Sequence, residues 1–174
     1  MKPFEETITE EEYDRFEEDF SNKNYVPWVE KYPTEIYPIF ASMLEYSSNV
    51  TREDIEYFQK LGVDINMICK LYLGNSRDNN LLKYACEYHD INLIEAAIQS
   101  GADVNHDTNG NTPLSSLLQG HNPSYMRNKN NILRGIKLLE SKGLRKILPN
   151  FIIENADKYD ESVRIFILSC CPID

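Results

Sequence analysis

Apolar residues recur at helical spacing in two neighbouring segments near the middle of the chain. In residues 82–86 (Leu-Lys-Tyr-Ala-Cys) the apolar positions are i, i+3 and i+4, and residues 93–98 repeat the pattern. This spacing puts the apolar side chains on one face of a helix. His89 and Asp90 lie between the segments, and both residue types tolerate the left-handed backbone of a tight reversal. We therefore predict two short helices joined by a turn.

Turn-forming residues mark where these helices end and where the next one begins. Gly101 follows the second apolar segment, at the position where a helix commonly ends on a residue with positive φ. Asp107 and residues 109–110 (Asn-Gly) favour a turn. Thr112 and Pro113 then begin another helix. Proline is tolerated there because it lacks a backbone N–H, and the N–H groups of the first helical turn have no partner within the helix.

This order of elements resembles an ankyrin repeat. The resemblance is carried by residues 82–86, 91–95 (Ile-Asn-Leu-Ile-Glu), 101–105 (Gly-Ala-Asp-Val-Asn) and 110–114 (Gly-Asn-Thr-Pro-Leu). The turn departs from the family pattern, which usually reads Gly-His where residues 89–90 read His-Asp. The resemblance implies two short helices and a protruding loop per unit, and each unit needs stacked neighbours to bury its apolar face.

Two degraded copies flank this unit. Upstream, Gly-Val-Asp-Ile-Asn at residues 62–66 lies 39 residues before its counterpart. Downstream, Gly143 stands 42 residues after Gly101, but Leu-Arg-Lys-Ile follows it in place of Ala-Asp-Val-Asn. A period of about 33 residues is typical of the family. Both spacings therefore predict insertions, one near residues 67–77 and one near 120–130.

We predict an all-α fold: an ankyrin-repeat helical solenoid of about three repeats, preceded by an acidic helix and followed by a helical cap. The predicted divisions are an acidic N-terminal segment (1–35), the repeats (36–144, divided as 36–77, 78–106 and 107–144) and the C-terminal cap (145–174). Two apolar stripes predict the helices of the cap: Ile147, Phe151 and Ile152, then Val163, Ile165, Phe166 and Leu168. A terminal unit also needs a polar outer face to stay soluble.

Charge is unevenly distributed along the chain. The formal net charge is −10, with −7 in residues 1–20, where nine acidic residues oppose two basic ones. Thr9 and Glu12 match the pattern of a capping box, and Tyr13, Phe16 and Phe20 follow at helical spacing, so this segment predicts an acidic amphipathic helix. Two interpretations stay open: the helix caps the open end of the repeat stack, or it is an arm that engages a basic partner.

The opposite charge gathers in residues 121–147, where seven basic residues oppose one acidic residue. This basic stretch is either a solvated helix face with an insertion that extends the binding surface, or a dock for the chain's own acidic N-terminus. We expect no nucleic-acid binding, because the whole chain is acidic and a nucleic-acid footprint normally shows in the overall charge.

Residues suited to catalysis or metal binding are sparse. Ser115, Ser116, His106 and Asp107 form the only cluster that suggests a hydrolase, and the repeat already explains their position beside a turn. The chain has no Gly-x-Ser-x-Gly elbow and no phosphate-binding loop. Its four cysteines show no Cys-x-x-Cys spacing and its three histidines are scattered. We therefore expect free thiols, no catalytic site, no metal and no cofactor.

Hydropathy gives no sign of a membrane or an export signal. No apolar run approaches the roughly 18 residues that span a bilayer. The sequence after Met1 is acidic rather than apolar, unlike a secretory signal. We expect a cytoplasmic protein without membrane contact.

The ankyrin resemblance implies where a partner binds. In that family, contacts come from the protruding loop tips and the exposed start of the inner helices, which together form a concave face. Mapped onto this chain, the predicted partner-binding residues are Ser76, Arg77, Asn79, Glu87, Tyr88, His106, Thr108, Asn109, Asn111 and Gln119. Tyr88 is the strongest candidate, because tyrosine gives a large, rigid contact with a polar tip. Its alternative role is structural, as a cover for the turn.

These features favour a non-catalytic protein–protein interaction module. The charge favours an inhibitor or immunity-type protein, because a dense acidic face suits the cationic site of a basic toxin or nuclease. The alternatives are a generic adaptor, or an adaptor or effector of a virus or intracellular microbe, where ankyrin repeats are widespread. An enzyme is the least favoured class.

Replacing Ala85 with Asp is expected to unfold the stack, because it buries an unpaired charge where helices meet. Loss of the helical circular dichroism signal, or of a cooperative thermal transition, measures this effect. A variant that melts at the wild-type temperature would contradict the predicted core position of Ala85.

Overall fold

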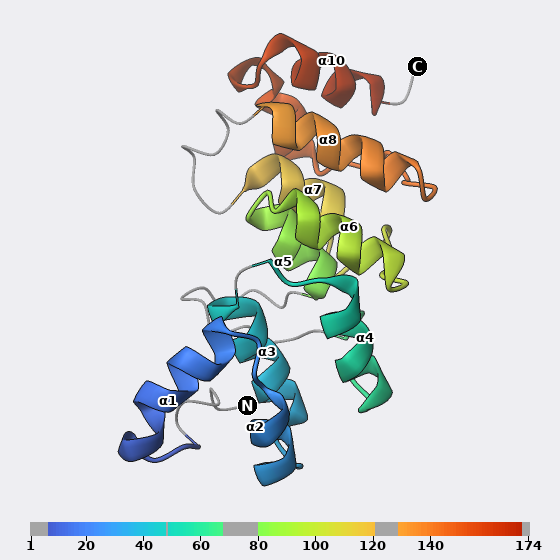
Figure 1. Ribbon diagram of the computed structural model, residues 1–174. Helices are drawn as coiled ribbons and strands as arrows, with labels where there is room; N and C mark the ends of the chain where they lie inside the picture. Colours follow the sequence, from blue (N-terminus) through green and yellow to red (C-terminus); the bar gives the residue numbers. More distant parts are fainter. Residues whose placement is uncertain (1–6, 48, 68–79, 121–128, 172–174) are drawn as a thin grey trace.

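The computed structural model describes residues 7–47, 49–67, 80–120 and 129–171 of the 174-residue chain. In these ranges the regular elements are helices, so the all-α prediction is confirmed (Figure 1). The helices are α1 (Glu10–Ser21), α2 (Val26–Lys31), α3 (Ile36–Tyr46), α4 (Arg52–Lys60), α5 (Leu81–Glu87), α6 (Ile91–Gln99), α7 (Pro113–Gln119), α8 (Lys129–Glu140), α9 (Asn150–Glu154), η3 (Ala156–Lys158) and α10 (Glu161–Ser169). Most of both predicted insertions lies outside the described residues.

The helices from α4 onward lie in two layers. In one layer α5 packs against α7 and α7 against α9, while in the other α4 packs against α6, α6 against α8 and α8 against α10. Successive helical hairpins are thereby stacked along one direction, with α1 and α10 at opposite ends of the molecule (Figure 1). The predicted C-terminal cap continues this layout, because α9 and α10 extend the two layers by one more hairpin.

A glycine in the left-handed region follows three helices of the second layer. Gly62, Gly101 and Gly143 have φ of +96°, +92° and +81° and follow α4, α6 and α8. A side chain at such a φ strains the backbone, which explains why glycine recurs at this position. The repeated glycines found in the sequence therefore mark equivalent turns in three hairpins.

Asparagine side chains join the loops that follow these turns. The Oδ1 atom of Asn66 accepts a hydrogen bond from the backbone N–H of Asp103 at 2.8 Å. Asn105 occupies the same place one hairpin later: its Oδ1 accepts from the N–H of Arg145 at 2.6 Å, and its Nδ2 donates to the carbonyl of Gly143 at 3.0 Å. Each asparagine thus fixes the spacing between neighbouring loops.

The turn between α5 and α6 reverses at His89, as predicted. His89 has a φ of +54°, and Asp90 accepts hydrogen bonds from the N–H groups of Asn92 and Leu93 at the start of α6. The buried His89 ring places Nε2 2.7 Å from the carbonyl oxygen of Leu117. Because that oxygen only accepts, Nε2 donates, and the turn is tied to the next hairpin.

The apolar stripes read from the sequence form the core of the central hairpins. Leu82, Ala85 and Cys86 of α5 are fully buried, as are Ile94 and Ala97 of α6. Burial also raises the pKa of the Cys86 thiol, which keeps this cysteine protonated and inert.

The N-terminal segment is anchored to the stack by one buried carboxylate. Asp54 of α4 accepts hydrogen bonds from the Tyr25 hydroxyl at 2.6 Å, from the Lys23 ammonium at 2.8 Å and from the N–H of Thr51 at 2.8 Å. Burial by itself would raise the pKa of Asp54, but the hydrogen bonds from Lys23 and Tyr25 outweigh burial and lower it. The ionised carboxylate therefore holds residues 23–25 against the start of α4.

The two apolar stripes of residues 147–168 are only partly buried. Ile152 and Val163 are buried, but Ile147, Phe151, Ile165 and Leu168 are exposed. On α10 the reason is geometric: Val163 and Ile167 are turned toward α8 and η3, and Ile165 and Leu168 lie on the opposite side of the helix. The exposed side of α10 therefore carries Ile165 and Leu168 among polar residues such as Glu161 and Arg164, where a wholly polar side was expected.

Replacing Asp54 with Asn is expected to lower the free energy of unfolding at pH 7 by about 2 kcal/mol, because the variant loses hydrogen bonds to a charged group and leaves Lys23 without its counter-charge. Urea denaturation measures the change. Glu56→Gln is the control, since the Glu56–Arg52 pair lies at the surface and such pairs contribute about 0.5 kcal/mol.

Comparing wild type with Asp54→Asn also tests how this stabilisation depends on pH. The pKa of Asp54 is lower in the folded state than in the unfolded chain, so its stabilisation is fully present above the unfolded pKa of about 3.9 and is lost as the pH falls through the folded value. The stability difference between wild type and Asp54→Asn should shrink at pH 3. A difference that stays constant between pH 7 and pH 3 would show that the charge of Asp54 is not the stabilising feature.

Candidate protein-binding surfaces

Helix α1 is fixed to the stack by its aromatic side. Phe16 and Phe20 are fully buried, and the Phe16 ring lies edge-on to Trp28 and Tyr46 at centroid distances of 5.7 and 5.2 Å. The helix packs against α3. This arrangement fits the interpretation of α1 as a cover for one end of the stack.

Two acidic residues of the N-terminal helix have partners within the chain. Glu12 accepts hydrogen bonds from the Lys31 ammonium, from the N–H of Thr9 at 2.9 Å and from the Tyr32 hydroxyl at 3.1 Å. The Lys31 contact, followed by that of Thr9, lowers the pKa of Glu12 to about 2. Asp19 accepts hydrogen bonds from the side chains of Arg15, Asn24 and Trp28.

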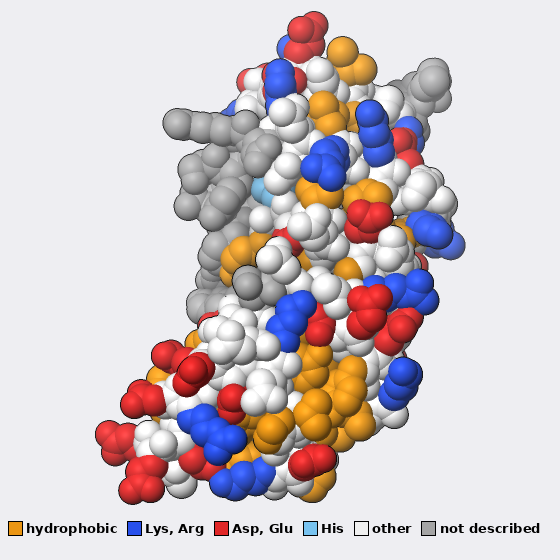
Figure 2. All heavy atoms as spheres, in the orientation of Figure 1, with side chains coloured by type: hydrophobic (Ala, Val, Ile, Leu, Met, Phe, Trp, Pro, Cys, Tyr) orange, Lys and Arg blue, Asp and Glu red, His pale blue; other side chains and the backbone are white. Residues whose placement is uncertain are grey.

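The remaining acidic residues of α1 form a separate surface. These five residues are Glu10, Glu11, Asp14, Glu17 and Glu18. All five are exposed, and none forms an ion pair with a residue that the structure describes. At 100° per residue they fall within an arc of roughly 120° on the side away from Phe16 and Phe20. We call this surface the acidic stripe, and Figure 2 shows acidic side chains gathered over α1.

The loop between α6 and α7, residues 100–112, brings several predicted contact residues together. Thr108 and Asn111 form an antiparallel bridge through backbone hydrogen bonds of 3.2 and 3.0 Å. The tip is closed by Asp107, whose Oδ1 accepts from the N–H of Gly110 at 2.7 Å. Asn109 is exposed at the tip with a φ of +54°. We call this loop the finger.

One predicted contact residue of the finger has a structural role. The Oδ1 atom of Asn111 accepts hydrogen bonds from the Ser115 and Ser116 hydroxyls at 2.9 and 3.2 Å. Ser115 also belongs to the capping box of Thr112 at the start of α7. The two serines considered for a hydrolase are buried and organise this helix start.

The other predicted contact residues lie away from the finger. Glu87 and Tyr88 stand at the C-terminal end of α5 and Gln119 at that of α7, whereas the finger leads into the N-terminal end of α7. The length of α7, about 10 Å, separates the two groups. Tyr88 is half-buried, with its ring 4.7 Å from that of Tyr84. Ser76, Arg77 and Asn79 lie outside the described residues.

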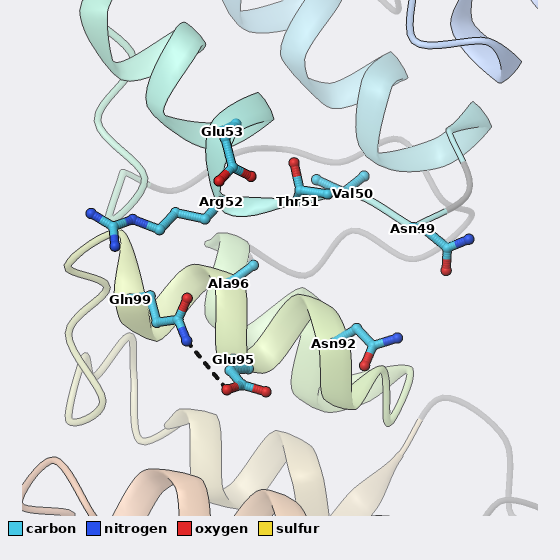
Figure 3. A pocket seen from close by; sticks show the side chains of 9 residues that line it. All are labelled: Asn49, Val50, Thr51, Arg52, Glu53, Asn92, Glu95, Ala96 and Gln99. Atoms are coloured by element: carbon cyan, nitrogen blue, oxygen red, sulfur yellow. Dashed lines mark hydrogen bonds between the residues drawn. The ribbon is translucent and has the colours of Figure 1, made fainter.

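An open hollow between α4 and α6 was not anticipated from the sequence. It has a volume of about 620 Å³ and is lined by Asn49, Val50, Thr51, Arg52, Glu53, Asn92, Glu95, Ala96 and Gln99. In Figure 3 the side chains of Asn92, Glu95 and Gln99 project from one side of α6. The hollow combines polar residues of two hairpins whose contact depends on stacking, so no local pattern signals it.

The basic stretch lies at the other end of the molecule from α1. Within it, Lys129 pairs with Asp160 at 3.4 Å and Lys146 with Glu140 at 2.9 Å. Its other described cations are exposed, namely Arg134, Lys137, Lys142 and Arg145. Because α1 packs on α3, far from α8 (Figure 1), the described part of the basic stretch is not a dock for the N-terminal helix of the same chain.

The described residues offer neither a metal-binding cluster nor a membrane-spanning helix. Across the described ranges, no three His, Cys, Asp or Glu side chains are grouped so that they could hold a metal ion. None of the helices described here is both long and apolar enough to cross a membrane.

The comparison with known proteins gives no match. No protein-family model matches the chain, and no similar protein was found among curated proteins or solved structures. The candidate surfaces therefore have to be judged by their own geometry and charge.

Proposed function

We propose that this chain is a non-catalytic protein-binding module of ankyrin-repeat type, and that its acidic stripe binds a basic protein. The repeated helical hairpins, the positive-φ glycines after α4, α6 and α8, and the asparagine links between loops support the repeat assignment. The observation that carries the binding proposal is the acidic stripe: five exposed carboxylates on a helix whose opposite side is buried.

The rigidity of α1 makes the stripe suited to binding. Phe16, Phe20 and the Glu12–Lys31 pair hold the helix in place before any partner arrives, so little ordering entropy is lost on association. A dense patch of one charge also steers an oppositely charged partner toward it and raises the association rate. Salt screens this attraction, because the Debye length is about 10 Å at 0.1 M.

The charge of the stripe indicates the class of partner. It repels nucleic acid and attracts proteins with a cationic surface, so a basic toxin or nuclease in the cytoplasm is the partner that fits best. Occupying the cationic site of such a protein would block its substrate. The role we propose is therefore that of an inhibitor or immunity-type protein.

The stripe is tested by neutralising it without removing the helix. The variant Glu10→Gln, Glu11→Gln, Asp14→Asn, Glu17→Gln and Glu18→Gln is compared with a control of equal net charge, Glu30→Gln, Glu45→Gln, Glu53→Gln, Glu56→Gln and Glu95→Gln. Proteins captured from a lysate of the native host are identified, and the dissociation constant of each purified basic partner is measured.

We expect the stripe variant to bind at least tenfold more weakly than wild type, and the control to bind within a few-fold of wild type. Binding of wild type should also weaken strongly between 0.05 and about 0.5 M salt, as expected for exposed charges. Equal affinity of the two variants would overturn the role of the stripe.

A second candidate function is an adaptor or effector of a virus or intracellular microbe that binds through the finger or Tyr88. The closed, exposed finger tip at Asn109 favours this alternative. Tyr88→Ala is expected to leave folding largely intact, because the side chain is half-buried, and to weaken binding about 30-fold if Tyr88 is a central contact. Thermal melting and affinity are measured together, and a variant that unfolds would instead assign Tyr88 a structural role.

A further inference from the structure

The last hairpin carries a concentration of exposed apolar side chains. Of the six large hydrophobic residues exposed in the described ranges, four belong to residues 147–168. Their exposed fractions are 68% for Ile147, 48% for Phe151, 61% for Ile165 and 47% for Leu168. We call these four residues the C-terminal apolar face.

The position of this face follows from how α9 and α10 pack. Val163 and Ile167 of α10 point into the core, and at 100° per residue Ile165 and Leu168 fall on the opposite side of the helix. Phe151 is exposed beside the buried Ile152 of α9. Figure 2 shows hydrophobic side chains on the surface over α10. Ile165 and Leu168 thus lie on the side of α10 away from its contacts with α8 and η3, where a further helix of this layer would stack.

Ile147 strengthens this interpretation. It stands four residues after Gly143, the place that Asn66 and Asn105 hold after their own glycines. Those asparagines hydrogen-bond to the backbone of the following loop, and isoleucine provides no such bond. The polar link between loops therefore ends here and an apolar side chain replaces it.

The area of the face is suited to a protein interface. At about 150–200 Å² for a large apolar side chain, the four exposed fractions add up to roughly 400 Å². A standard interface buries about 800 Å² on each partner, a little over half of it apolar. The exposed area of the C-terminal apolar face is therefore close to the apolar area that one partner buries in such an interface.

The charges around the face indicate which partner covers it. Described residues 141–171 carry five basic side chains (Lys142, Arg145, Lys146, Lys158 and Arg164) and four acidic ones (Glu154, Asp157, Asp160 and Glu161). Lys146 and Asp160 already pair within the chain, with Glu140 and Lys129, which leaves four basic and three acidic side chains outside these pairs. A nearly neutral, mixed surface meets a copy of itself without net repulsion. Helix α1 at the other end presents an unlike surface, because Phe16 and Phe20 are buried and its exposed side is the acidic stripe.

We infer that the C-terminal apolar face binds a second copy of this chain. The two copies meet through α9 and α10 about a two-fold axis, which closes the assembly at two chains. The acidic stripes then lie at the distant ends of the dimer, where each is free to bind. This inference does not depend on the proposed function of the stripe.

The test is the mass of the full chain in solution. Sedimentation velocity and light scattering are recorded from about 1 to 100 µM protein, for wild type, for Ile165→Glu with Leu168→Glu, and for Val26→Glu. Val26 is the matched control, since it is exposed to a similar degree at the other end of the molecule. Because Ile165 and Leu168 are exposed, the double variant should keep the circular dichroism and melting temperature of the wild type.

We expect wild type and Val26→Glu to reach twice the monomer mass of 20.2 kDa. The dissociation constant of the dimer should be at least 100-fold higher for the double variant. Dimerisation should persist in 0.5 M salt, where binding through the acidic stripe is screened, so failure of one proposal is separable from failure of the other. A wild-type monomer at 100 µM, an unchanged dimer in the double variant, or equal loss in Val26→Glu would overturn the inference. Phe151→Ser, which adds no charge, is expected to weaken the dimer as well.

Discussion

A single helical hairpin of this chain is too small to bury its own apolar side, and the whole structure depends on the stacking that removes that side from water. Burying one large aliphatic side chain stabilises the fold by about 2 kcal/mol, whereas ordering each residue costs about 1–2 kcal/mol in backbone entropy alone. A seven-residue helix such as α5 meets this cost only because Leu82, Ala85 and Cys86 are covered on all sides. The links through Asn66 and Asn105 then set the spacing at which the hairpins meet.

Stacking creates two ends, and the chain treats them differently. At one end α1 and α2 supply an aromatic cover, which Asp54 ties to the first stacked hairpin through Lys23 and Tyr25. At the other end α9 and α10 extend the layers but leave Ile165 and Leu168 exposed. One end therefore presents charge on a fixed helix and the other presents apolar surface. Surfaces of these two kinds attract different partners, because the first acts through long-range electrostatics and the second through contact with another apolar surface.

Features set by contacts within a few residues were predictable from the sequence. The helical stripes, the reversal at His89, the glycines after α4, α6 and α8, and the capping residues Thr9 and Thr112 all follow this rule. The acidic character of α1 and its buried aromatic side were predictable for the same reason, because both follow from the residue pattern within one helix. Of the expected contact residues, the finger group was predictable as a loop, but the role of Asn111 as an acceptor for Ser115 was not.

The sequence by itself thus determined the helices, the turns between them and the charge that each segment carries, because these depend on intrinsic backbone preference and on neighbours one helical turn away. Only the tertiary structure decided which acids pair within the chain, as with Glu12 and Lys31, and which are exposed on the stripe. It also decided that the hollow between α4 and α6 exists and that Ile165 faces outward. These features depend on residues far apart in the chain, and a side chain's burial is set by what stacks against it rather than by its own hydrophobicity.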